Sequence, residues 1–216
     1  MQIRRTANAG VLLTLDDASI LLDGVCQEVS PYLATPGEIR QELMCCPPDA
    51  VLFSHHHEDH FDPDYCRAAN KPIYSTVQVA DILPGLVRLE KTCSVGKIKI
   101  TAIPTRHMGH YGKTTQHCSF VIQGSQTIWF LGDASPTELK QLSDFSKPDV
   151  LIVPYPYIGT PAALKNVSEL LPCKIVLLHM PLREIDPDGI WNSITDGIES
   201  LKANLYLPEL GETLNL

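Results

Sequence analysis

The most informative stretch of this sequence is Ser54-His55-His56-His57-Glu58-Asp59-His60, which holds four of the eight histidines within six residues. The apolar residues 51–53 directly before it predict a short buried strand. Alternate residues of an extended segment point to the same side, so His55 and His57 can bind one metal ion together. This stretch therefore predicts a metal site at the end of a strand.

The residues after the first histidines predict a helix and ligands for a second ion. Asp62 is a preferred N-cap residue and Pro63 suits the first helical position, so a helix is expected through about Ala69. Asp59 and His60 lie where the extended segment turns into that helix, which places them within reach of a second ion. Imidazole and carboxylate ligands suit zinc, and they also suit iron or manganese.

A chance polar loop or an expression tag is the alternative explanation for this run of histidines. A tag would lie at one end of the chain, whereas residues 55–60 lie well inside it. The metal site is therefore the favoured interpretation.

The composition excludes several classes of protein. Of the 216 residues, 17 are Lys or Arg and 25 are Asp or Glu, and the net charge of −8 argues against binding to nucleic-acid phosphates. No apolar run approaches the ~20 residues that cross a bilayer. The run Val11–Leu15 is shorter than the ~7–15 apolar residues of a signal peptide. We therefore expect a cytoplasmic protein that acts on a small molecule, with no membrane or nucleic-acid partner, folded as one domain over residues 1–216.

The seven cysteines are scattered, and none belongs to a C-x-x-C pair. This spacing favours neither a zinc knuckle nor a thioredoxin-type redox site. We expect all seven to be reduced packing residues, as in a reducing compartment. They are Cys26, Cys45, Cys46, Cys66, Cys93, Cys118 and Cys173.

The order of the apolar runs predicts a mixed α/β domain. Val11–Leu15 and Ile20–Asp23 predict a hairpin, and helical patterns follow at about 136–142, 162–170 and 189–203. Four apolar strands run directly into a histidine or an aspartate. Those polar residues are His55, His107, Asp133 and His179. Strand ends that meet at one edge of a sheet are a rigid scaffold for a reactive centre.

At these positions the sequence resembles the metallo-β-lactamase-fold hydrolases, over most of its length and in the family's motif order. Residues 8–24 resemble the opening hairpin, and the first metal motif corresponds to His55-x-His57-x-Asp59-His60. The later motifs are Ile103-Pro104-Thr105-Arg106-His107, Phe130-Leu131-Gly132-Asp133 and Leu177-Leu178-His179. The resemblance implies a four-layer αβ/βα sandwich, in which two mixed β-sheets are flanked by helices.

The same resemblance implies two divalent metal ions, with zinc expected first and iron or manganese left open. Asp59 and Asp133 are the implied catalytic carboxylates. The implied ligands are His55, His57 and His107 for the first ion, Asp59, His60 and His179 for the second, and Asp133 as the bridge between them.

The implied function is metal-dependent hydrolysis of a small, anionic ester, lactone or phosphoester. Two ions would hold a hydroxide, because they lower the pKa of water from 15.7 toward ~7. Asp59 or a water could return a proton to the leaving group. Two alternatives stay open: a metal-containing binding or regulatory protein without turnover, and a nuclease of the same fold, which the acidic charge disfavours.

The sequence leaves open which histidine is the metal ligand of the second motif. His107 is preferred as the ligand because it follows a predicted strand directly, whereas His117 precedes the strand at 119–122 and is expected to be a packed or surface residue. His56 and Glu58 alternate with the ligands of the first motif and should point away from the ions.

Three residues are candidates for substrate contacts. His110 lies in a glycine-containing loop that is expected to cover the metals. Tyr155 follows a strand end, with a tyrosine packed on the sheet as the alternative. Arg183 lies four residues after His179 and could hold a carboxylate or phosphate, although an ordinary surface or ion-pairing arginine is the favoured interpretation.

Overall fold

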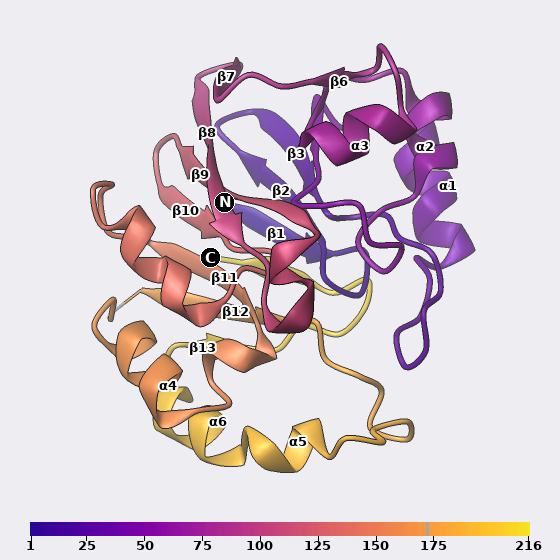
Figure 1. Ribbon diagram of the computed structural model, residues 1–216. Helices are drawn as coiled ribbons and strands as arrows, with labels where there is room; N and C mark the ends of the chain where they lie inside the picture. The colour runs from indigo at the N-terminus through magenta and orange to yellow at the C-terminus, as the bar shows by residue number, and fades with distance from the viewer. Residues whose placement is uncertain (172) are drawn as a thin grey trace.

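The computed structural model describes residues 1–171 and 173–216. Two seven-stranded sheets pack face to face, and helices cover the outer face of each (Figure 1). Both sheets are mixed, so the expected four-layer αβ/βα sandwich is confirmed. None of the helices in these residues is long and apolar enough to cross a membrane.

The first sheet has an antiparallel half and a parallel half. In sheet order its strands are β14 (Thr213–Asn215), β1 (Gln2–Arg5), β2 (Val11–Leu15), β3 (Ala18–Leu22), β4 (Ala50–Leu52), β5 (Ile73–Tyr74) and β6 (Val87–Arg88). Pairing is antiparallel from β14 to β3 and parallel from β3 to β6.

The second sheet is built in the same way. In sheet order its strands are β13 (Leu205–Tyr206), β12 (Lys174–Leu178), β11 (Val150–Pro154), β10 (Thr127–Phe130), β9 (Gln116–Gln123), β8 (Ile98–Arg106) and β7 (Thr92–Val95). Pairing is parallel from β13 to β10 and antiparallel from β10 to β7.

The helices fall into two groups, one on each sheet (Figure 1). The first group is α1 (Gly37–Cys45), α2 (Pro63–Ala69) and α3 (Val77–Ile82), and the second is α4 (Pro161–Ser168), α5 (Ile190–Ser193) and α6 (Thr195–Leu201). Three short 3₁₀ segments complete the fold: η1 (Gly109–Lys113), η2 (Pro136–Leu142) and η3 (Tyr155–Tyr157).

Alternation along the strands divides the core into layers. In β3, Ile20 and Leu22 join the core between the sheets, whereas Leu21 packs in the layer of α1–α3. In β12, Val176 faces the inner core and Leu177 the layer of α4–α6. Strands with both faces covered are apolar at nearly every position, so these strands could be predicted from apolar runs in the sequence.

Two local predictions are confirmed. The hairpin of β2 and β3 turns at Asp16 and Asp17, whose φ values of 48° and 63° are those of a type I′ turn. Asp62 caps α2, because its carboxylate accepts hydrogen bonds from the backbone N–H groups of Asp64 (2.9 Å) and Tyr65 (3.1 Å).

The predicted helix over 189–203 is instead two helices, α5 and α6. The chain leaves helical geometry at Ile194 (φ −105°, ψ 3°), which is fully buried in the layer beneath. A Cβ on Gly197 would lie 2.3 Å from the carbonyl oxygen of Ile158, so close packing of α6 against that segment also requires a glycine. Tertiary packing thus overrides the continuous helical pattern.

Candidate metal centre

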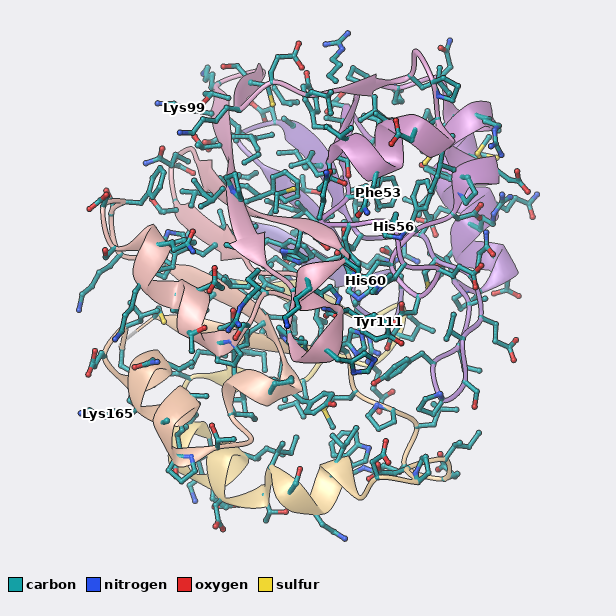
Figure 2. All side chains as sticks on the ribbon, in the orientation of Figure 1. Phe53, His56, His60, Lys99, Tyr111 and Lys165 are labelled. Atoms are coloured by element: carbon teal, nitrogen blue, oxygen red, sulfur yellow. The ribbon has the colours of Figure 1, made fainter. Side chains whose placement is uncertain are left out.

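The predicted ligands meet at one edge of the sandwich because the strands that precede them end there. His55 follows β4, His107 follows β8, Asp133 follows β10 and His179 follows β12. Parallel neighbours such as β11 and β12 end at the same edge, and ligands of open α/β sheets bind at such carboxyl ends. His60 lies in the interior in Figure 2, whereas Lys99 and Lys165 extend outward.

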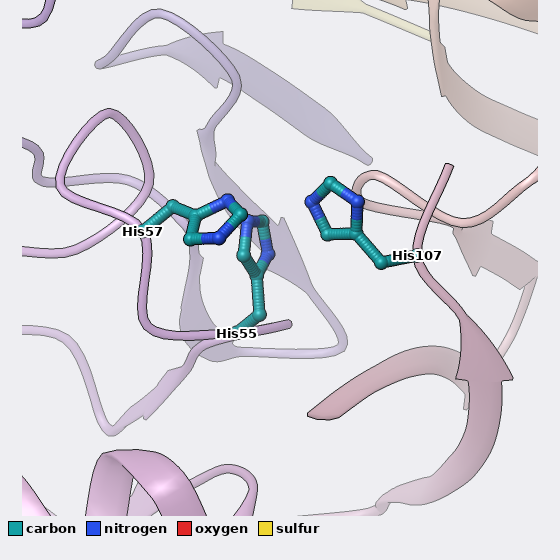
Figure 3. Close-up of side chains that lie close together, drawn as sticks. All are labelled: His55, His57 and His107. Atoms are coloured by element: carbon teal, nitrogen blue, oxygen red, sulfur yellow. The ribbon is translucent and has the colours of Figure 1, made fainter. Parts of the chain in front are cut away.

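The first cluster consists of His55, His57 and His107, which Figure 3 shows side by side. One nitrogen from each ring lies within 4.8 Å of the corresponding atoms of the other two. The ring centroid of His55 lies 4.5 Å from that of His57 and 4.8 Å from that of His107. Three imidazoles at this spacing can hold one divalent ion.

Hydrogen bonds orient two of these three rings. The Nδ1 of His107 lies 2.8 Å from the carbonyl oxygen of Met108, to which it donates. The Nε2 of His57 lies 3.1 Å from the hydroxyl of Thr115. Partners of this kind fix the tautomer, so that the opposite nitrogen presents its lone pair to a metal.

The second cluster consists of Asp59, His60 and His179, whose ligand atoms also lie within 4.8 Å of one another. The Nε2 of His179 lies 3.1 Å from Oδ2 of Asp59, and that of His60 lies 3.9 Å from the same oxygen. His179 has a φ of 60°, which is uncommon for a residue other than glycine. The strand end thus turns sharply at this residue, a conformation that marks functional sites.

Asp133 lies between the two clusters. Its Oδ1 is 3.4 Å from Nε2 of His60, and its Oδ2 is 3.6 Å from Nε2 of both His107 and His179. Gly132 permits this position, since a Cβ there would lie 2.6 Å from the side chain of Ser54 and its φ is +52°. One carboxylate therefore faces ligand atoms of both clusters.

The residues fit a pair of divalent cations. Several buried polar atoms have no hydrogen-bond partner. Such atoms destabilise the folded protein unless a bound ligand interacts with them. These atoms include Nε2 of His55, His60, His107 and His179 and Oδ1 of Asp133. Burial also lowers the pKa of the imidazoles of the first cluster, that of His57 to about 4, so these rings are neutral as ligation requires.

A family model described as the beta-lactamase superfamily domain matches residues 2–179. The chain belongs to the beta-lactamase superfamily. A comparison of its sequence with curated proteins finds no match.

Several solved structures share this fold. An isothiocyanate hydrolase from Delia radicum gut bacteria is 20% identical with a TM-score of 0.76, over 100% of this chain and 99% of that one. A "possible metal-dependent hydrolase" from Veillonella parvula is 19% identical with a TM-score of 0.77 over the same shares. CmlA, a diiron beta-hydroxylase from Streptomyces venezuelae, is 18% identical with a TM-score of 0.69, over 100% of this chain and 54% of CmlA.

Asp23 is a site residue of this superfamily member that sequence reasoning missed. It is fully buried at the end of β3, and its Oδ2 accepts a hydrogen bond from Nδ1 of His60 at 2.8 Å. The same carboxylate accepts from the backbone N–H of Ser54 (2.7 Å) and from its hydroxyl, and that hydroxyl contacts Nδ1 of His55 at 2.9 Å. Asp23 therefore orients one histidine of each cluster.

Charges in the second cluster and its surroundings are strongly coupled. Burial alone would lower the pKa of His60, but the carboxylates of Asp133, Asp23 and Asp59 raise it well above its ordinary value. Burial raises the pKa of Asp133, yet the imidazoles of His179 and His60 outweigh it and hold this pKa far below normal. Asp133 is thus an anion throughout the working range of pH.

Replacing Asp23 with asparagine is expected to weaken metal binding at the second cluster. The amide would present N–H donors to Nδ1 of His60, which would move the ring proton to Nε2, the atom that faces the cluster. Partners that orient ligands are worth about 10–100-fold in metal affinity. Titration against a chelating dye should show that loss for one ion, whereas Asp17→Asn, the same change in the exposed turn, should show none. Equal affinities would refute this role.

His117 is buried but belongs to neither cluster. Its Nδ1 lies 2.7 Å from the hydroxyl of Thr105, and its ring centroid lies 5.3 Å from that of His55. His107, by contrast, contributes a ligand atom to the first cluster.

Alanine at these two positions should therefore have different effects on metal content. We expect His107→Ala to lose one of two ions per chain, because it removes one of three ligands. We expect His117→Ala to retain both ions at a cost in folding stability. Elemental analysis of the two purified variants distinguishes them, and the reverse result would mean that the second motif is centred on His117.

A cavity of about 820 Å³ opens over the metal centre and is called the metal-site cavity below. Of the predicted substrate contacts, His110 and Tyr155 line it. His110 is exposed on η1, and its ring lies against that of Tyr111 with centroids 4.1 Å apart and planes tilted by 37°. Tyr155 begins η3, with its ring centroid 6.5 Å from that of His179.

Arg183 is not brought to the metal-site cavity. Its guanidinium lies 3.7 Å from the ring centroid of Trp191, and both residues line a neighbouring hollow of about 430 Å³. Trp191 is itself only partly buried, unlike Trp129. Arg183 is close to His179 in the sequence but does not line the metal-site cavity.

Proposed function

We propose that this superfamily member is a metal-dependent hydrolase with two divalent ions, held by His55, His57 and His107 at one position and by Asp59, His60 and His179 at the other. Asp133 would bridge them. The observation that supports this proposal is the set of buried, unpartnered ligand atoms that converge from both clusters on the Asp133 carboxylate. Zinc suits this donor set best, and iron is the second candidate.

Bound there, two divalent ions would supply a hydroxide nucleophile at neutral pH and polarise the bond that it attacks. Asp59 would take the proton to the leaving group. Burial by itself would raise the pKa of Asp59, but contact with His179 and the charge of His60 keep it below its ordinary value. This carboxylate is therefore ionised before the reaction and able to accept a proton during it.

The proposed substrates are small esters, lactones and phosphoesters. The neighbour from Delia radicum gut bacteria is an isothiocyanate hydrolase, and a further structural neighbour is a diphosphatase of the PhnP family, so carbon and phosphorus electrophiles both belong in a screen. The ions would hold the reacting group, and the walls of the metal-site cavity would hold the remainder.

The test is turnover by the zinc-loaded protein on an aryl ester, a lactone, a phosphodiester and an isothiocyanate. On a substrate that is hydrolysed, we expect Asp59→Asn to lower kcat by about a hundredfold with a small change in KM. Asp64→Asn, at an exposed carboxylate in α2, is the matched control. A loaded protein that binds a small molecule tightly and hydrolyses nothing would favour a binding or regulatory role.

A further inference from the structure

Three tyrosines line the metal-site cavity, and they surround both clusters. Tyr111 lies on the first cluster, with its ring centroid 5.1 Å from that of His57. Tyr32 and Tyr155 lie beside the second, with centroids 4.4 Å and 6.5 Å from that of His179. A ligand bound at the metal centre would therefore extend between aromatic rings.

The remaining wall of the cavity is largely apolar. Ile82 at the end of α3 and Met108 after β8 line it, together with Val29 and Phe61. Ile82 is 38% exposed, so one apolar side chain stands at the rim and is open to a ligand. These residues offer apolar surface and no positive charge to the part of a ligand that lies away from the ions.

No lysine or arginine lines the described part of the cavity wall. Arg183 stacks on Trp191 in the neighbouring hollow, and Arg106 lines a different hollow. Beyond the proposed ligands, the carboxylate that lines the wall is that of Glu58, which is exposed. An anionic group distant from the ions would thus lose water without gaining a cation.

We propose that the distal part of the substrate, beyond the group that reacts at the metals, is uncharged and aromatic or otherwise apolar. This inference rests on the proposed function, because the metal centre fixes which end of the substrate reacts. A cationic distal group fits less well, since the carboxylate beyond the proposed ligands, Glu58, is exposed to solvent and would pair with it only weakly. The resemblance implied an anionic substrate, and Arg183 was a candidate to hold its charge, but Arg183 does not line this cavity.

The experiment uses three hydroxamates that present the same metal-binding group and differ only beyond it. They are acetohydroxamic acid, benzohydroxamic acid and 4-carboxybenzohydroxamic acid. Dissociation constants are measured by calorimetry on the zinc-loaded protein at about 0.15 M salt, where long-range attraction to the ions is screened. We expect benzohydroxamate to bind about tenfold more tightly than acetohydroxamate, because its ring becomes buried. The added carboxylate should cost about tenfold or more, because it is desolvated without a partner.

Variants of the wall test which residues are responsible. Tyr111→Ala should weaken benzohydroxamate about two- to tenfold and leave acetohydroxamate unchanged, whereas Tyr111→Phe should retain the binding. Ile82→Lys should strengthen 4-carboxybenzohydroxamate selectively, because it supplies the missing cation. Leu86→Lys is the matched control, since Leu86 is 45% exposed and does not line the cavity.

Equal or tighter binding of the carboxylated ligand by the unaltered protein would overturn this inference, as would three equal affinities. The same samples are analysed for metal and for hydrolysis. Zinc bound with the expected order of affinities but without turnover would contradict the proposed hydrolysis and leave the assignment of the cavity standing. A protein that takes up no metal would overturn the proposed function, and this inference with it.

Discussion

Replacing Asp133 with alanine is expected to empty both metal sites and to abolish hydrolysis. Its carboxylate faces Nε2 of His60, His107 and His179, so it offsets positive charge at both proposed ions at once. The loss of turnover should exceed the about 10–100-fold that follows removal of a residue that only orients a ligand. Metal content should fall from about two ions per chain to less than one.

Elemental analysis and kcat measurements on the purified variant check this result, with circular dichroism to establish that it is folded. Asp144→Ala is the control, because Asp144 is exposed and outside both clusters. A variant that keeps two ions per chain would show that Asp133 is not the bridge.

Removing the metal from the native protein should lower its Tm by about 10 °C. A ligand present at about 1,000 times its Kd stabilises the folded state by about 4.1 kcal/mol. For a chain of this length each 1 kcal/mol corresponds to about 2–4 °C. The metal-free protein would retain buried imidazole nitrogens without partners, the unstable state that the ions relieve.

Thermal unfolding before and after dialysis against a chelator measures the shift, and added zinc should restore the original Tm. The variant His107→Ala, which lacks one proposed ligand, should show a smaller shift. An unchanged Tm after complete metal removal would mean that the clusters are stable without ions.

Four of the seven proposed metal ligands could be predicted from the sequence because each is a polar residue that follows an apolar strand. His55, His107, Asp133 and His179 all follow strands of the sandwich, and the structure brings them together at one edge. A polar residue at the end of a buried strand can be recognised in the sequence, because the strand before it is apolar at almost every position.

The role of Asp23 depends on pairing between segments about thirty residues apart. Leu22 pairs with Leu52 in the parallel ladder of β3 and β4, and this register places Asp23 beside Ser54. The apolar run that ends at Asp23 is the signal that could have revealed it, because the same pattern marked the other site residues. The register of β3 against β4 could not be predicted from the sequence.

The substrate contacts could be predicted only in part, because segments far apart in the sequence build the walls of the metal-site cavity. Those segments contain Tyr32, Phe61, Ile82, Tyr111 and Tyr155. A residue's distance from a ligand along the chain does not determine whether it lines this cavity.

Anomalous diffraction from crystals of the zinc-loaded protein, recorded on both sides of the zinc absorption edge, tests the two-ion centre most directly. We expect two peaks about 3.5–4 Å apart. One should lie among His55, His57 and His107, the other among Asp59, His60 and His179, with Asp133 between them. A single peak within the buried group of Asp23, His55 and His60, which is the other possible ligand set in the described chain, would contradict it, and so would the absence of any peak.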